Sequence, residues 1–107
     1  METTPKIAMI SQPMNGKSKE EIKAVREAAE MHLEALGYIV INSRFKTDTS
    51  VKNEALYNLA RSLAVMSLCD AVYFCDGWRC ARGCTIEHTA AFNYGLDMLY
   101  EREGDEE

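Results

Sequence analysis

The chain has 107 residues, 47% of them hydrophobic and 27% charged, which is enough for one globular domain with one core. Its net charge of −5 argues against non-specific binding to nucleic acid polymers, which usually requires a basic face. No apolar run approaches the roughly 18–20 residues of a membrane span, and the first residues lack the pattern of a signal peptide. We therefore expect a cytoplasmic protein without a membrane partner.

The first third of the chain predicts a strand, a loop and a helix. Ile7–Ile10 is a continuous apolar run, typical of a strand buried on both faces in a parallel sheet. The loop of residues 11–17 is rich in turn formers. Ser18 with Glu21 forms a capping-box signature, so we expect a helix to begin there, and Gly37 is placed to end it.

The middle of the chain predicts a second strand over Tyr38–Ile41 and a second helix that ends near Leu68. The stretch Asn42–Lys52 between them is polar and longer than the usual connection. Long loops in compact domains are often functional, but a plain surface loop explains this composition equally well. The sequence leaves both interpretations open.

The last third predicts a third strand, Ala71–Cys75, and a glycine-bearing loop, Asp76–Gly83, in which Gly83 marks the boundary to the next helix. That helix runs from about Cys84 to Asn93 or Tyr94, with Gly95 as its cap. Asp97–Tyr100 predicts a short last strand.

The order of these elements predicts the fold class. Strands that alternate with helices indicate an α/β fold with an open parallel sheet of about four or five strands and helices on both faces. This arrangement is a flavodoxin- or Rossmann-like three-layer sandwich. We expect one domain over residues 1–103 and an acidic, disordered tail over residues 104–107.

The four cysteines are expected to be thiols in a reducing compartment. Cys80, Cys84 and His88 are spaced four apart and would share one face of a continuous helix, as metal ligands require. Gly83 breaks that stripe if the helix begins after it, and three ligands fall short of the four in a structural zinc site. We therefore expect no metal and no other cofactor.

Two loops have the position and composition of a binding site, because ligands of open parallel sheets bind beyond the carboxyl ends of the strands. They follow the first and third strands, which we expect to be neighbours. The loop of residues 11–17 offers backbone N–H groups, Ser11, Asn15 and a helix N-terminus, which suit an anion or a hydroxyl group. A capped helix after a tight turn explains the same residues. In the loop of residues 76–83, Trp78 either stacks on a base or sugar or plugs the end of the sheet.

Glu87 is the best candidate for a reacting side chain. It falls in the first turn of the predicted third helix, where the helix dipole favours the carboxylate by a few tenths to about 1 kcal/mol. A carboxylate at a pocket floor can attack an electron-poor sugar carbon. Dipole compensation on a solvated turn is the commoner reason for an early-helix glutamate. His88 points about 100° away around the helix, so we do not expect it to be the acid–base partner of Glu87.

Three ordered segments together resemble the nucleoside 2-deoxyribosyltransferase-like superfamily, most closely a branch of short bacterial and phage proteins. They are ISQPMNG at residues 10–16, CDAVYF at 69–74 followed by Gly77-Trp78, and RGCTIEH at 82–88. The resemblance covers nearly the whole chain. It implies that ten residues bind the substrate, namely Ser11, Gln12, Pro13, Met14, Gly16, Asp76, Gly77, Trp78, Arg82 and Gly83.

The resemblance gives Glu87 the role of a catalytic nucleophile. The corresponding glutamate of the superfamily attacks the anomeric carbon of a 2-deoxyribonucleoside or its 5′-phosphate, and water or a second base resolves the deoxyribosyl ester. The expected partner is therefore a small-molecule nucleoside or nucleotide. The superfamily also implies a homo-oligomer, dimer or larger, in which a neighbouring subunit closes the pocket.

The chain also departs from the superfamily pattern at three helper positions. Met9 stands where a transferase has a tyrosine, Ser62 where the second helix has an acid, and Ala81 where the second loop has a ligand-contacting serine. Asp76 and Asp48 are the candidates to replace the acid. These departures favour the alternative of a non-catalytic module that binds a nucleotide or sugar phosphate. A structural or interaction protein ranks third.

Overall fold

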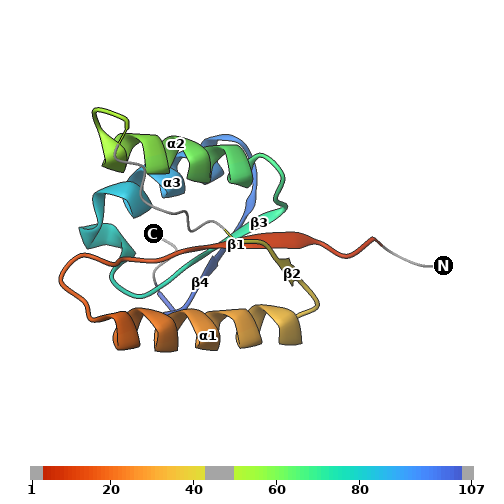
Figure 1. Cartoon of the computed structure of the whole chain (residues 1–107). Helices are drawn as coiled ribbons and strands as arrows, with labels where there is room; N and C mark the ends of the chain where they lie inside the picture. Colours follow the sequence, from red (N-terminus) through yellow and green to blue (C-terminus); the bar gives the residue numbers. More distant parts are fainter. Residues whose placement is uncertain (1–3, 43–49, 105–107) are drawn as a thin grey trace.

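The computed structural model describes residues 4–42 and 50–104 (Figure 1). Their elements are β1 (Ile7–Ser11), α1 (Lys19–Ala35), β2 (Ile39–Val40), α2 (Glu54–Met66), β3 (Ala71–Phe74), the 3-10 turn η1 (Trp78–Cys80), α3 (Arg82–Asn93) and β4 (Asp97–Tyr100). The strands pair in parallel in the order β2-β1-β3-β4. The predicted α/β class and the adjacency of the first and third strands are therefore confirmed.

Side chains that alternate along the central strands build two cores, one on each face of the sheet. Ala8 and Ile10 of β1 face α1, which contributes Ala29 and Leu33 to the first core. Met9 faces the opposite way, into a second core that includes residues of α2, η1 and α3. Figure 1 shows the resulting layers, with α1 on one side of the sheet and α2 and α3 on the other. The predicted helices on both faces are confirmed.

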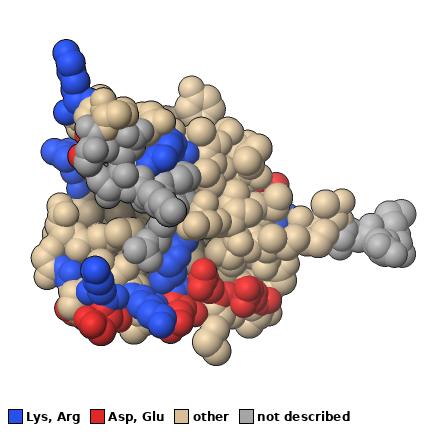
Figure 2. Space-filling model, in the orientation of Figure 1, with Lys and Arg blue, Asp and Glu red and all other residues tan. Residues whose placement is uncertain are grey.

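Local signals at the ends of α1 act as the sequence predicts. The Ser18 hydroxyl accepts a hydrogen bond from the backbone N–H of Glu21, and the Glu21 carboxylate accepts one from the N–H of Ser18. Gly37 follows the helix with a φ of +94°, a conformation that strains other residues. The outer face of α1 carries intermixed acidic and basic side chains at the lower edge of the view in Figure 2. This face is solvated, and the helix buries its other side.

The third helix begins two residues earlier than predicted, at Arg82. Gly83 therefore lies inside the first turn of α3 and does not mark the boundary between loop and helix. The start of α3 is not visible in the sequence because η1 leads directly into the helix through Ala81. The side chain of Ala81 cannot accept a capping hydrogen bond, so it gives no N-cap signal. The second strand is also shorter than the predicted Tyr38–Ile41, although the Ile41 N–H still donates to the carbonyl oxygen of Ala8.

Two predictions fall largely outside the described residues. These are the long connection, of which residues 43–49 are not described, and the acidic tail, of which residues 105–107 are not described. In the part of the chain that is described, no helix combines the length and the apolar composition needed to cross a membrane.

Candidate active site

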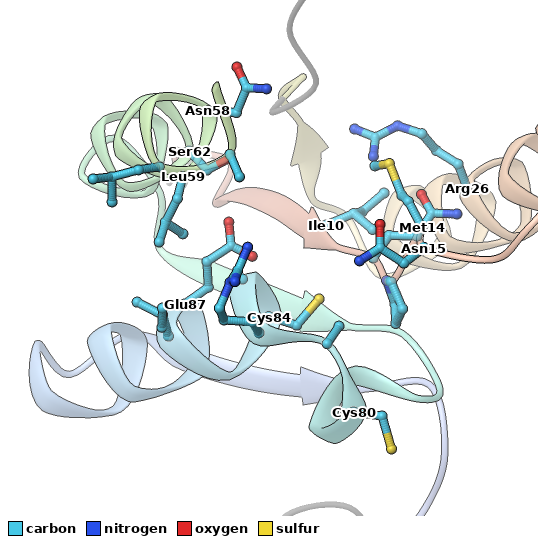
Figure 3. Close-up of a pocket in the computed structure, with 18 of the residues that line it drawn as sticks. Ile10, Met14, Asn15, Arg26, Asn58, Leu59, Ser62, Cys80, Cys84 and Glu87 are labelled. Carbon is cyan, nitrogen blue, oxygen red and sulfur yellow. The ribbon is translucent and has the colours of Figure 1, made fainter. Parts of the chain in front are cut away.

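A cavity of about 810 Å³ opens at the carboxyl end of β1, between the loop after that strand, α2 and the start of α3 (Figure 3). This volume lies in the range that accommodates small-molecule ligands. Seven of the residues predicted from the sequence line it together, namely Gln12, Pro13, Met14, Asn15, Arg82, Gly83 and Glu87. The structure therefore brings the start of the first loop and the end of the second loop into one site.

Glu87 is buried in the wall of this cavity, with 7% of its surface exposed. One carboxylate oxygen, Oε1, accepts a hydrogen bond of 2.7 Å from the Ser11 hydroxyl. Burial raises the pKa of Glu87 above its usual value, and hydrogen bonds from Ser11 and Ser62 oppose that rise. The carboxyl group is thus desolvated but held by two hydroxyl donors, an environment that is common at functional sites.

The predicted position of Glu87 in the first helical turn is wrong. Because α3 begins at Arg82, Glu87 is its sixth residue, and the first turn carries no acidic side chain. The helix dipole acts mainly on the first turn, so it does not account for the presence of this glutamate. The solvated-turn alternative fails as well, since the side chain is buried against Ser11.

The geometry of the sheet places Ser11 under Glu87. Ser11 is the last residue of β1 and pairs with Phe74 of β3 in the parallel ladder. It has the same parity as Met9, so its side chain points to the face covered by α2 and α3. Only 1% of Ser11 is exposed, and Ser11 does not itself line the cavity.

The opposite wall of the cavity comes from the α1 layer. Figure 3 shows Glu87 and Ser62 on one side and Arg26, Met14 and Asn15 on the other. Arg26 of α1 is 8% exposed, and its Nε lies 3.8 Å from Oε2 of Glu30. A cationic side chain therefore faces the same cavity as the Glu87 carboxyl group.

Several lining residues were not predicted from the sequence. Arg26 interrupts the apolar stripe of α1, where it lies four residues after Ile22 and three before Ala29. A charged residue inside such a stripe is the signal that could have identified it. The α2 side chains Asn58 and Ser62 also line the cavity, but nothing in the local pattern distinguishes them from ordinary polar helix residues.

The middle of the second loop lies away from the cavity. Trp78 is 5% exposed, and its ring stacks on His88 at a centroid distance of 4.0 Å and also contacts Phe74 at 5.5 Å. The indole plugs the end of the second core.

The other predicted residues of this region also lie outside the cavity. Asp76 is exposed and lies 3.8 Å from Arg102. Gly77 has a φ of +89° and supports the turn. None of Trp78, Asp76, Gly77 and Gly16 lines the cavity.

His88 does not line the cavity with Glu87. Its Nε2 lies 2.7 Å from the hydroxyl oxygen of Tyr100, on the side of α3 that carries Trp78. Burial lowers the pKa of His88, and the charge of Arg79 lowers it further. These effects favour the neutral imidazole, which belongs to the aromatic cluster at the sheet end.

The cysteines near the cavity are free thiols. Cys84 is buried, and desolvation raises its pKa to about 11, although a hydrogen bond with Ser11 opposes the rise. A thiol with that pKa is a poor nucleophile at neutral pH. Cys80 is exposed at the rim, and its side chain points away from Glu87 in Figure 3. Residues 4–42 and 50–104 hold no group of three or more side chains arranged to bind a metal ion.

The three departures from the superfamily pattern lie in different environments. Met9 is fully buried in the second core, so it does not reach a ligand. Ser62 and Ala81 both line the cavity, and Ser62 donates to Glu87 where an acid was expected. Among the described lining residues, Glu87 is the only one with a carboxyl group. Asp76 lies elsewhere, and Asp48 is outside the described residues.

Comparison with known proteins identifies a family for nearly the whole chain. The family model described as "Domain of unknown function (DUF4406)" matches residues 6–100. No curated protein and no solved structure matches the chain. The matched range includes every described element from β1 to β4 and the whole lining of the cavity.

Proposed function

Since the chain belongs to the DUF4406 family, we propose that it is an enzyme that cleaves the N-glycosidic bond of a nucleoside or nucleotide, with Glu87 as the nucleophile. The observation that carries this proposal is the buried Glu87 carboxyl group, hydrogen-bonded to Ser11 in the wall of a cavity of about 810 Å³. The resemblance to the nucleoside 2-deoxyribosyltransferase-like superfamily supplies the substrate class.

The proposed reaction has two steps. A Glu87 oxygen forms a bond to the anomeric carbon of the sugar while the bond to the base nitrogen breaks, and that nitrogen keeps the electron pair and takes a proton from water. The resulting glycosyl ester is then attacked by water, which gives the free sugar, or by the nitrogen of a second base, which gives a new nucleoside. Either attack regenerates the Glu87 carboxylate.

The surroundings of Glu87 support the role of a nucleophile. The Ser11 and Ser62 hydroxyls donate to the carboxyl group, so they favour its ionised form and hold its orientation. Burial removes water that would otherwise solvate the attacking oxygen. Because burial raises the pKa of Glu87, the reactive carboxylate is populated only above that pKa, and we expect the rate to rise with pH through it.

The test is incubation with each 2′-deoxynucleoside and its 5′-monophosphate, with free base measured by chromatography. We expect base release from the wild type and a loss of at least about 1,000-fold in Glu87→Gln, which keeps the shape of the side chain but removes the nucleophile. Glu34→Gln, on the exposed face of α1, is the matched control and should retain activity. Equal rates in the wild type and Glu87→Gln would exclude this mechanism.

A second candidate is a module that binds a nucleotide or sugar phosphate without turnover. The specific observation in its favour is that the described lining offers no second carboxyl group to protonate the leaving base. Thermal-shift measurements with the same nucleotides distinguish the two. Stabilisation of the wild type without any base release supports the binding module, whereas base release supports the enzyme.

We also propose that the active form is a homo-oligomer. Leu56 and Ile86 line the cavity and yet remain 61% and 41% exposed, which leaves an apolar rim around the ligand space. Exposed apolar side chains next to a binding site are typical of surfaces covered by another chain. Light scattering coupled to gel filtration tests this proposal. We expect the wild type to be a dimer or a larger species and Leu56→Asp to have a lower molecular mass because its assembly dissociates. A monomeric wild type would contradict the proposal.

A further inference from the structure

We propose that Gln12 selects the substrate by accepting a hydrogen bond from the sugar hydroxyl of a 2′-deoxynucleoside 5′-monophosphate. This inference rests on the proposed function, because the position of the sugar is set by attack from Glu87. The resemblance implies only that Gln12 binds the substrate, and this inference names the atom of Gln12 and the substrate group that it recognises.

The first step of the argument is the orientation of the Gln12 amide. Its Nε2 donates a 2.7 Å hydrogen bond to the backbone carbonyl oxygen of Ile22, in the first turns of α1. A flipped amide would place Oε1 against that carbonyl oxygen, and two acceptors repel each other. The nitrogen is therefore fixed on the helix, and Oε1 points away from it.

The second step is that Oε1 has no partner. Gln12 is 8% exposed, and its Oε1 is buried without a hydrogen-bond partner among the described residues. Buried acceptors in folded proteins are nearly always satisfied, so an orphaned one in a residue that lines a cavity indicates a donor supplied by a ligand. The ligand group must carry a hydrogen, which excludes the oxygens of a fully ionised phosphate.

The third step places this acceptor relative to the reacting carbon. Ser11, which donates to Glu87, and Gln12 are adjacent in the chain, so their Cα atoms are only about 3.8 Å apart. Their side chains go to opposite layers, Ser11 to the α3 side and Gln12 to the α1 side, where it bonds Ile22. Glu87 and Gln12 thus approach the end of β1 from opposite walls.

The sugar ring carries the carbon that Glu87 attacks, so we place the ring between these two walls and the base beyond it. The donor that reaches Gln12 is accordingly a hydroxyl on the ring. In a 2′-deoxynucleoside 5′-monophosphate the 3′-hydroxyl is the only free one, since the 5′-oxygen carries the phosphate. Arg26, on the same wall of the cavity, and Arg82 both line it and are cations that could receive that phosphate.

The experiment is a double-mutant type of binding cycle. The protein loses the Gln12 side-chain oxygen, and the ligand loses its 3′-hydroxyl. Affinities of 2′-deoxy- and 2′,3′-dideoxynucleoside 5′-monophosphates are measured by calorimetry in the Glu87→Gln background, so turnover cannot interfere. The same pair is measured after adding Gln12→Met, which keeps the size of the side chain but has no oxygen. We expect a preference of roughly 3- to 10-fold for the 3′-hydroxyl with Gln12, and none with Met at that position.

Lys19→Met is the matched control, because Lys19 is exposed at the start of α1 and does not line the cavity. It should retain the full preference. If Gln12→Met melts below the working temperature, Gln12→Ala, which also lacks the acceptor oxygen, takes its place and should likewise show no preference. An unchanged preference in Gln12→Met overturns the assignment of Gln12 while the proposed function stands. Absence of binding by every nucleotide in the wild-type protein would overturn both.

Discussion

The two loops at the carboxyl end of the sheet follow neighbouring strands but have different roles. The loop after β1 sends Gln12, Pro13 and Met14 into the cavity. The loop after β3 first folds into η1 and buries Trp78 under the aromatic cluster, and only its last residues reach the ligand space. Position beyond a strand end therefore does not make a residue a ligand contact. The direction in which the chain leaves the strand decides.

The largest expected effect separates the structural role of the second loop from ligand binding. Trp78→Ala removes a buried ring that stacks on His88 at 4.0 Å, so we expect it to lower the free energy of unfolding by about 3–5 kcal/mol. Denaturant unfolding measures this loss. Tyr94→Ala, which removes an aromatic ring that is 84% exposed, is the control and should change stability by less than about 0.5 kcal/mol. A stable Trp78→Ala protein that no longer binds nucleotides would reverse the assignment.

The next effect concerns the contact that joins the first loop to α3. Ser11→Ala removes the 2.7 Å hydrogen bond to Glu87, and bonds to charged groups contribute about 1.5–3 kcal/mol. We expect a loss of stability of that size at pH values where Glu87 is ionised, together with a further rise in the pKa of Glu87. Unfolding experiments and an NMR titration of the carboxyl carbon measure the two effects.

Ser67→Ala provides the matched control for that substitution. The Ser67 hydroxyl bonds only a backbone carbonyl oxygen at the exposed end of α2, far from Glu87 in the chain. Ser67→Ala should therefore leave the titration of Glu87 unchanged. If Ser11→Ala leaves the pKa of Glu87 where it is in the wild type, the hydrogen bond does not hold the carboxylate.

The sequence predicts the fold well because its signals are local. Continuous apolar runs identify the strands, and the capping box at Ser18 with Gly37 delimits α1 as observed. The start of α3 was missed because Ala81 provides no capping side chain, so the most visible signal was Gly83, two residues too late. A helix start without a cap leaves no pattern in the sequence.

The site is only partly predictable because it depends on contacts between distant segments. Glu87 and Ser11 are 76 residues apart, and only the pairing of β1 with β3 brings their elements together. The same holds for Trp78, for which the local composition allowed both a ligand contact and a core plug. Its burial follows from His88, Phe74 and Tyr100, which surround it from three other elements.

The pH dependence of the free energy of unfolding tests the burial of Glu87 itself. Because its pKa is raised in the folded state, the folded chain keeps this proton to a higher pH than the unfolded chain, whose value is near 4.5. The stabilisation that this raised pKa contributes is fully present below pH 4.5 and is lost as the pH rises through the pKa of Glu87 in the folded state. We expect this decline in the wild type and in Glu34→Gln, but not in Glu87→Gln. Chemical unfolding across this range measures it, and an equal decline in Glu87→Gln would show that other groups cause it.

The smallest effects distinguish the two glycines of the second loop. Gly77 has a φ of +89°, so Gly77→Ala forces an L-residue into the left-handed region and should cost about 1–2 kcal/mol. Gly83 has helical geometry inside α3, and a Cβ added there would meet no atom within 4 Å. Gly83→Ala should therefore raise the free energy of unfolding by about 0.5–1 kcal/mol.

The two substitutions should affect nucleotide affinity differently from stability. The stabilising one, Gly83→Ala, should weaken binding, whereas the destabilising one, Gly77→Ala, should not. Gly83 lines the cavity and Gly77 does not, so the new methyl group should weaken nucleotide binding only in Gly83→Ala. Calorimetry on both variants, each compared with its own unfolding curve, gives the two quantities together. A Gly83→Ala protein that is more stable and binds nucleotides as well as the wild type would show that the ligand does not approach this turn. The second loop would then serve the fold alone, and the ligand would bind against the first loop and Glu87.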